Sequence, residues 1–256
     1  MSSGDHLAGL ADLAVVLYHE PQDACALYNR GIARRETGDL NGALSDFSTA
    51  YAIEPQLTEA LYNLALVHIE SDAFEQAAQE LESYLQHEPC DSLGHLALGL
   101  AYVELGMSTQ ALQEYCRAVE LDSGNTDAYL AQGNAHLSRN EALEAIGCYS
   151  QFLERTAGNA EVYSSRAHAY ALAGSYELAS EDYTEALSIE PDSAYLYVER
   201  GKAYLSAGKR QEAIQDWTNA ILRDRTNYEP YQLRGDAYLS AGECLRAIAD
   251  FTLAVS

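Results

Sequence analysis

The side chains that could do chemistry are seven histidines, five cysteines and 39 aspartates and glutamates, and their spacing does not suit a reactive centre. The sequence contains no phosphate-binding glycine loop, no His-Glu-x-x-His and no Gly-x-Ser-x-Gly motif. A metal site needs converging ligands, whereas the histidines are dispersed and the cysteines form no Cys-x-x-Cys pair. We therefore expect no catalytic residue, no cofactor and no metal, and we expect that the protein is not an enzyme.

One charged pair recurs at a fixed offset along the chain. An arginine precedes an aspartate by 16 residues in four places, at Arg30–Asp46, Arg166–Asp182, Arg200–Asp216 and Arg234–Asp250. Three equivalent places carry neither residue and hold Leu64 with Glu80, Leu98 with Glu114, and Gln132 with Cys148. Arginine and aspartate therefore occur together or not at all, and arginine matches a carboxylate with two donors. We predict a structural salt bridge at each of the four places.

The pairs belong to a repeat with a period of 34 residues, and such a period marks a chain built from copies of one supersecondary unit. Its simplest marker is an alanine found seven times, at Ala43, Ala77, Ala111, Ala145, Ala179, Ala213 and Ala247. Four residues later stands a large side chain, at Phe47, Leu81, Tyr115, Tyr149, Tyr183, Trp217 and Phe251. Twelve residues before the alanine stands a small residue, at Gly31, Ala65, Gly99, Gly133, Ala167, Gly201 and Gly235. The small residues let two helices approach closely, and the large side chain fills the volume beside them.

Each copy holds two stretches with apolar residues at helical spacing, such as Tyr197, Gly201 and Tyr204 in one stretch and Ala213 and Trp217 in the next. Between the two stretches lies a residue type that tolerates a positive φ and closes a helix, at Gly38, Asp72, Gly106, Asn140, Gly174, Gly208 and Gly242. Each copy is therefore predicted to be a helix, a tight turn and a second helix. The salt bridges would join the two helices of one copy, or one copy to the next.

This pattern of small, aromatic and alanine positions resembles the tetratricopeptide repeat. The resemblance covers residues 24–256 and implies an all-α, right-handed superhelical solenoid of antiparallel helix pairs. We expect seven repeats, at residues 24–57, 58–91, 92–125, 126–159, 160–193, 194–227 and 228–256, preceded by an N-terminal half-repeat at residues 1–23 that caps the array. At the other end no capping helix follows, so Ile248, Phe251 and Val255 should form an apolar end.

The resemblance implies a scaffold that binds a partner protein or peptide in a concave groove lined by the first helices. The partner-binding residues expected there are Tyr28, Asn29, Glu36, Tyr62, Asn63, Leu66, Glu70, Leu96, Leu100, Glu104, Leu130 and Asn134. Asparagine can both donate to and accept from a peptide backbone, and the row of glutamates would favour lysine or arginine in the peptide. The alternative, in which the tyrosines pack internally and the glutamates are only solvated, stays open.

The composition excludes several partners. A net charge of −24 and an isoelectric point near 4.4 would repel nucleic-acid phosphates and anionic membranes. The charge suits either the solubility of a long chain or a basic partner. The N-terminal residues lack the basic start of a secretory signal, and no apolar run is long enough to span a membrane. We therefore expect a cytoplasmic protein that neither binds nucleic acid nor inserts into a membrane.

Two other functions fit the same sequence. The apolar C-terminal end could pack on a second copy of the chain, which would make the protein a self-associating structural component and a homo-oligomer. Alternatively, the array could be the recruiting module of a longer enzyme.

Overall fold

The structure, a computed structural model, describes residues 3–156 and 158–255. Within these residues the chain forms fifteen α-helices and no β-strand, which confirms the all-α fold. Their bounds are α1 (Ser3–His19), α2 (Ala24–Glu36), α3 (Leu40–Ile53), α4 (Glu59–Glu70), α5 (Phe74–His87), α6 (Ser92–Glu104), α7 (Ser108–Leu121), α8 (Thr126–Ser138), α9 (Ala142–Arg155), α10 (Ala160–Leu172), α11 (Tyr176–Ile189), α12 (Ala194–Ser206), α13 (Arg210–Arg223), α14 (Glu229–Ser240) and α15 (Cys244–Ala254).

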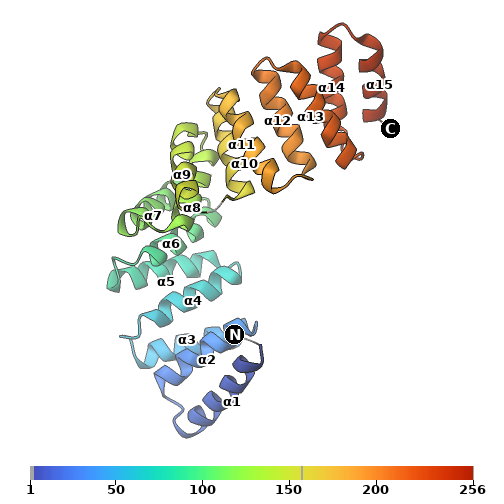
Figure 1. Cartoon of the computed structure of the whole chain (residues 1–256). Coiled ribbons are helices and arrows are strands. Elements are labelled where there is room, and N and C mark those ends of the chain that lie inside the picture. The colour runs from blue at the N-terminus through green and yellow to red at the C-terminus, as the bar shows by residue number, and fades with distance from the viewer. Residues whose placement is uncertain (1–2, 157, 256) are drawn as a thin grey trace. The chain divides into compact units, whose positions relative to one another are not determined.

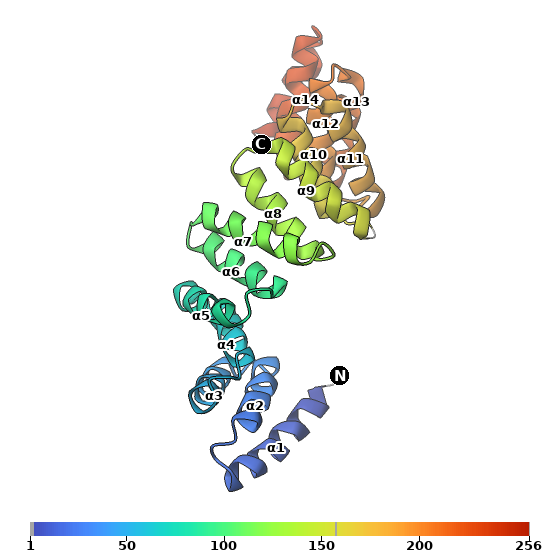
Figure 2. The same ribbon diagram turned by 90° about the vertical axis from the view of Figure 1, so that its left-hand side faces the viewer.

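The helices stack in chain order as a solenoid of pairs. Each even-numbered helix from α2 to α14 is the first helix of a pair, and the helix that follows it is the second (Figure 1). The chain divides into two compact units, unit 1 at residues 1–131 and unit 2 at residues 132–256. In unit 1, α1 packs against the first helix of the first pair, which is α2 (Figure 2).

The two helices of a pair meet where a small residue lies against a buried large side chain. Trp217 on α13 is fully buried against Gly201 on α12, and a Cβ added at Gly201 would lie 2.5 Å from the indole Nε1 atom. The same contact is made at Gly31–Phe47, Gly99–Tyr115, Gly133–Tyr149 and Gly235–Phe251. The small residue and the aromatic residue recur together because the helix spacing requires both.

The predicted turn residues close the first helices as expected. All seven have a positive φ, from 56° at Asp72 to 84° at Gly38. At the end of α12, the Gly208 N–H donates to the carbonyl of Leu205 at 3.0 Å, and the Lys209 N–H donates to that of Tyr204 at 2.8 Å. These bonds satisfy carbonyls at the helix end, and they set the distance to the second helix.

The Arg–Asp pairs lie inside the helix pairs. Nε and Nη2 of Arg200 donate to the two carboxylate oxygens of Asp216 at 2.7 and 2.8 Å. The same two-pronged contact is made at Arg30–Asp46, Arg166–Asp182 and Arg234–Asp250. Nη1 of Arg200 also donates to the hydroxyl of Thr184 on α11 at 3.0 Å. One arginine therefore ties its own pair together and links it to the preceding pair.

Histidine and glutamate form contacts in the three copies that lack an Arg–Asp pair. The Nδ1 atoms lie 2.6 to 2.7 Å from carboxylate oxygens at His68–Glu80, His95–Glu114 and His136–Glu141. Burial raises the pKa of Glu80, although the hydrogen bond to His68 acts in the opposite direction. The polar contact in these three copies is thus made by histidine and glutamate in place of arginine and aspartate.

We expect the protein to lose stability as the pH rises above about 10. Burial is the main cause that raises the pKa of Tyr115 and of Tyr149 from 10.0 to about 12. A folded-state pKa above the unfolded one means that the stabilisation is complete below the unfolded pKa and is lost as the pH rises through the folded pKa. Since one pKa unit is worth about 1.4 kcal/mol, Tyr115 alone accounts for about 3 kcal/mol.

Urea denaturation followed by circular dichroism at neutral pH and at about pH 11, which lies midway between the two pKa values, measures about half of this loss. The variant Tyr115→Phe keeps the buried ring and removes the titrating hydroxyl, so its alkaline loss should be smaller than that of the wild type. Equal losses in the two proteins would contradict the assignment of this titration to Tyr115.

Candidate partner-binding surface

The first helices of unit 1 form a layer of their own. α2 contacts α4, and α4 contacts α6, more closely than the successive second helices α3, α5 and α7 contact one another. A stack whose first helices are closer together curves toward them, so α2, α4 and α6 line the inner surface of unit 1. Most of the expected partner-binding residues belong to these three helices.

Tyr28 and Asn63 bond to each other on this surface. The Asn63 side-chain amide donates to the Tyr28 hydroxyl at 3.1 Å and to the carbonyl of Glu59 at 3.0 Å. The Tyr28 ring is half-buried and lies 5.8 Å from the ring of Phe47, centroid to centroid. Both residues therefore take part in joining α2 to α4.

Tyr62 has a similar position one helix pair further along. It is half-buried on α4, and its ring lies 5.4 Å from that of Tyr84 on α5. Burial raises the pKa of both hydroxyls. Tyr28 and Tyr62 thus contribute to helix packing as well as to the surface. Because their replacement would also disturb the packing, exposed neighbouring residues are better positions for testing partner binding.

The expected row of glutamates is not uniform. Glu70 on α4 accepts from Nε of Arg35 on α2 at 2.8 Å, so its charge is compensated inside the protein. Glu36 and Glu104 are exposed, and Glu104 forms no ion pair with any other residue in the described part of the chain. Of the row, Glu104 is therefore the residue with an uncompensated charge.

Helix α6 presents an apolar stripe to the inner surface. Leu93, Leu96, Leu100 and Val103 follow one another at helical spacing along one face. Leu93, Leu100 and Val103 are 55%, 45% and 42% exposed, whereas Leu96 is half-buried. These four residues are named the α6 stripe.

The remaining expected residues have varied surroundings. Asn29 on α2 is exposed, Leu66 on α4 is half-buried, and Leu130 on α8 is half-buried. Asn134 lies in unit 2, where its side-chain oxygen accepts from the Tyr149 hydroxyl at 2.8 Å. The structure therefore groups Asn29 and Leu66 with the α6 stripe on the three first helices of unit 1, while Asn134 belongs to the other unit.

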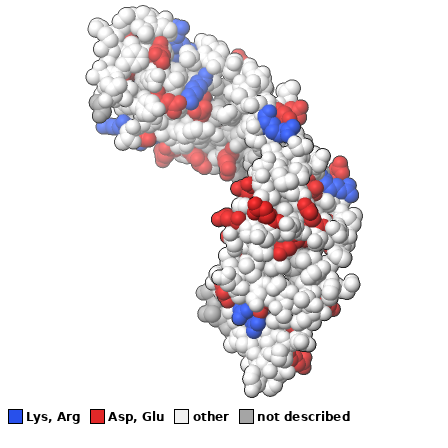
Figure 3. Space-filling model, turned by 180° about the vertical axis from the view of Figure 1, so that it is seen from behind, with Lys and Arg blue, Asp and Glu red and all other residues white. Residues whose placement is uncertain are grey.

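Acidic side chains dominate the charge of the surface. On the face shown in Figure 3 they outnumber the basic ones, and most basic side chains lie beside an acidic one. The ion pairs explain this, because most of the 15 lysines and arginines lie within 4.0 Å of a carboxylate. The 15 basic residues can pair with only part of the 39 acidic residues, so the surface carries an excess of negative charge.

One pocket was not predicted from the sequence. It lies in unit 2 between α10, α11 and α12 and has a volume of about 200 Å³. The sequence departs from the pattern here at Ala167. Five other copies have glycine at this position, and the sixth pairs its alanine, Ala65, with Leu81 rather than with an aromatic residue. Its aromatic partner, Tyr183, lines the pocket.

Residues 3–156 and 158–255 contain no cluster of metal ligands, no disulfide and no helix that could span a membrane. No group of three histidine, cysteine, aspartate or glutamate side chains could hold a metal ion. None of the five cysteines forms a disulfide within these residues. No described helix has the length and apolar character needed to cross a membrane.

Family models identify the repeat. Three models match, each described as a tetratricopeptide repeat, one at residues 34–101, one at 167–208, and one at both 96–160 and 198–256. The chain belongs to the tetratricopeptide repeat family. Members of this family are generally non-catalytic scaffolds for protein interaction, which agrees with the function expected from the sequence. No curated protein of similar sequence was found for this tetratricopeptide repeat protein.

Solved structures of other tetratricopeptide repeat proteins have the same fold. The C-terminal part of a repeat protein from Cytophaga hutchinsonii aligns with a TM-score of 0.78 at 16% identity, over 89% of this chain and 94% of that one. A repeat protein from Parabacteroides merdae aligns with a TM-score of 0.66 at 22% identity, over 91% and 92%. YrrB, described as a repeat protein with an unusual peptide-binding site, aligns with a TM-score of 0.63 at 22% identity, over 72% and 95%.

Proposed function

We propose that this protein is a non-catalytic, cytoplasmic scaffold that binds a segment of a partner protein on the inner surface of unit 1. The observation that carries the proposal is the α6 stripe, with three large apolar side chains exposed on one face of a helix. Clustered apolar exposure of this kind is typical of contact sites. The peptide-binding site named for YrrB, a structural neighbour, supports the same class of function.

The chemistry of the surface describes the segment that fits it. Apolar side chains of the partner would cover Leu93, Leu100 and Val103, and backbone groups could pair with the exposed amide of Asn29. Glu104 would favour a lysine or arginine nearby, and the excess of acidic residues over the whole chain would speed the approach of a basic partner. We therefore infer a partner segment that alternates apolar and basic residues.

The proposal is tested with peptides selected on the wild-type protein from a random-peptide display library. Fluorescence anisotropy then measures their dissociation constants for the double variant Leu93→Ser/Leu100→Ser. Burying each leucine in the complex contributes about 1.5–3 kcal/mol, so we expect binding to weaken at least about tenfold. Both side chains are exposed, so the helix packing of the variant stays intact.

The matched control is Leu178→Ser/Leu222→Ser, which removes two exposed leucines from the second helices α11 and α13. It should leave the affinity unchanged. Unchanged affinity in Leu93→Ser/Leu100→Ser, or an equal loss in the control, would contradict the proposed surface.

A further inference from the structure

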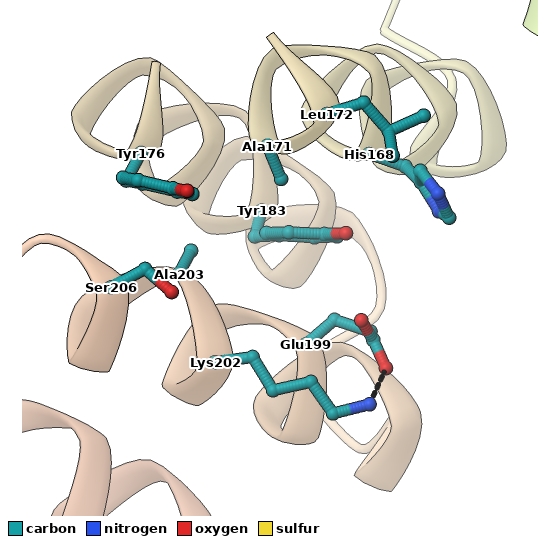
Figure 4. Close-up of a pocket in the computed structure, with 9 residues that line it drawn as sticks. All are labelled: His168, Ala171, Leu172, Tyr176, Tyr183, Glu199, Lys202, Ala203 and Ser206. Atoms are coloured by element: carbon teal, nitrogen blue, oxygen red, sulfur yellow. Dashed lines mark hydrogen bonds and ion pairs between the residues drawn. The ribbon is translucent and has the colours of Figure 1, made fainter. Parts of the chain in front are cut away.

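The pocket in unit 2 combines apolar walls with a charged rim. Leu172 on α10 and Ala203 on α12 line it, and Tyr183 on α11 lies between these two helices. Figure 4 shows Leu172 on one side of the Tyr183 ring and Glu199 and Lys202 on the other. At about 30 Å³ for a group the size of a water molecule, its volume of about 200 Å³ holds about seven non-hydrogen atoms.

The lysine at the rim is paired with two carboxylates. The Lys202 ammonium group lies 2.7 Å from a Glu199 oxygen and 2.8 Å from a Glu229 oxygen. Glu199 lines the pocket and Glu229 lies outside its lining, so the three charged groups together carry one unit of excess negative charge. A second cation entering the pocket would complete this balance, whereas an anion would be repelled.

Tyr183 offers a hydroxyl group that the protein does not use. Its side chain is only 2% exposed, and its hydroxyl makes no hydrogen bond to another residue in the described part of the chain. In the view of Figure 4 the hydroxyl lies at the end of the ring that is nearer to the Glu199 carboxylate. A hydroxyl oxygen and a carboxylate that face one space can both accept from a single ligand with several donors.

Ala167 distinguishes this copy from the copies that have glycine at the same position. In the copies with glycine at this position and an aromatic residue opposite, a Cβ would approach a ring atom to 2.4–2.7 Å. Ala167 carries a real Cβ, so the Tyr183 ring cannot occupy the place that the rings of the other copies take. The Tyr183 ring therefore packs differently against α10, and it lines the pocket, whereas Ala167 does not.

We propose that this pocket binds the side chain of an arginine from a partner protein. Its seven non-hydrogen atoms beyond Cα match the volume, and its aliphatic stem would lie along Leu172 and Ala203. The guanidinium group would donate to Glu199 and to the Tyr183 hydroxyl, which suits its planar set of donors better than the single point charge of lysine.

This proposal does not rest on the proposed surface of unit 1. The pocket is built only from residues of unit 2, so the proposed arginine site and the proposed α6 stripe can be tested independently of each other. The variant Leu93→Ser/Leu100→Ser should leave arginine binding in the pocket unchanged.

The test uses N-acetyl-arginine N-methylamide as the probe and the corresponding citrulline compound as its uncharged isostere. The methyl resonances of Ala171 and Ala203, both in the pocket lining, report binding in the full chain labelled with ¹³C at alanine methyls. We expect saturable shifts of these two resonances with the arginine probe, and an affinity at least about threefold higher than for citrulline, as for one partly exposed charge pair.

Two variants that change the charge of the pocket in opposite directions make the test more specific. Glu199→Gln should remove the preference for arginine over citrulline, whereas Lys202→Met should increase it, because it removes the competing cation. Tyr183→Phe, which keeps the ring, should weaken arginine binding. Glu212→Gln removes the same charge from an exposed position on α13 and should change nothing.

Three results would overturn the proposal. The first is equal binding of the arginine and citrulline probes to the wild type. The second is the absence of saturable shifts at Ala171 and Ala203. The third is an effect of Glu212→Gln as large as that of Glu199→Gln, which would assign the preference to the net charge of the protein rather than to the pocket.

Discussion

Replacing Arg200 by methionine is expected to lower the free energy of unfolding by about 3–5 kcal/mol, because the change leaves a buried carboxylate without its partner. The side chain of Asp216 is only 4% exposed, and that of Arg200 is 16% exposed. Both oxygens of Asp216 accept from Arg200, and this contact raises the pKa of the guanidinium group above its ordinary value. Burial thus separates this pair from surface ion pairs, which contribute about 0–1 kcal/mol.

Trp217 gives the measurement a local reporter. It is the one tryptophan in the sequence, it follows Asp216 directly, and it is fully buried between α12 and α13. Urea denaturation followed by its fluorescence therefore reads the stability of the helix pair that contains Arg200.

A double variant distinguishes the loss of the ion pair itself from the cost of leaving the Asp216 carboxylate buried without a partner. Arg200→Met/Asp216→Leu replaces the whole ion pair by apolar side chains and should recover most of the loss. Arg246→Met is the matched control, because Arg246 is 67% exposed and pairs with Glu243 only one helical turn away. It should cost less than about 1 kcal/mol. Additive losses from the two single changes at Arg200 and Asp216 would contradict the pairing.

Replacing Gly201 by alanine is expected to destabilise the protein by about 1–3 kcal/mol through overpacking. The added Cβ would lie 2.5 Å from Nε1 and 2.9 Å from Cδ1 of Trp217. The indole has little room to move, since it is fully buried and its Nε1–H donates to the carbonyl of Val198 at 3.3 Å. The glycine is therefore needed for the close approach of α12 and α13, despite its entropic cost in a helix.

Gly147 on α9 provides the opposite case. No heavy atom outside its own helix backbone and chain neighbours lies within 4 Å of a Cβ placed there. Gly147→Ala should therefore stabilise the protein by about 0.5–1 kcal/mol, the difference in helix propensity. Urea denaturation followed by circular dichroism compares the two variants, and a stability change of the same sign in both would contradict this account.

The candidate surface shows where sequence reasoning was incomplete. The apolar residues of α6 could be expected on the inner surface because their spacing is regular. The sequence did not indicate that Arg35 compensates Glu70, or that Asn63 bonds to Tyr28. These contacts join residues of different repeats through long or rotatable side chains, and a pattern that compares equivalent positions does not contain them.

The sequence by itself determined the helix pairs, their turns and the positions of the small and aromatic residues. It could do so because these features depend on contacts within one copy, and several copies show the same requirement independently. Only the tertiary structure decided which side chains stay exposed on α6 and how the arginines link one pair to the preceding pair. It alone also revealed the pocket beside Tyr183. Exposed side chains and cavities depend on how neighbouring copies pack against each other. The effect of a single substitution in the repeat pattern, such as Ala167, therefore cannot be deduced from the pattern alone.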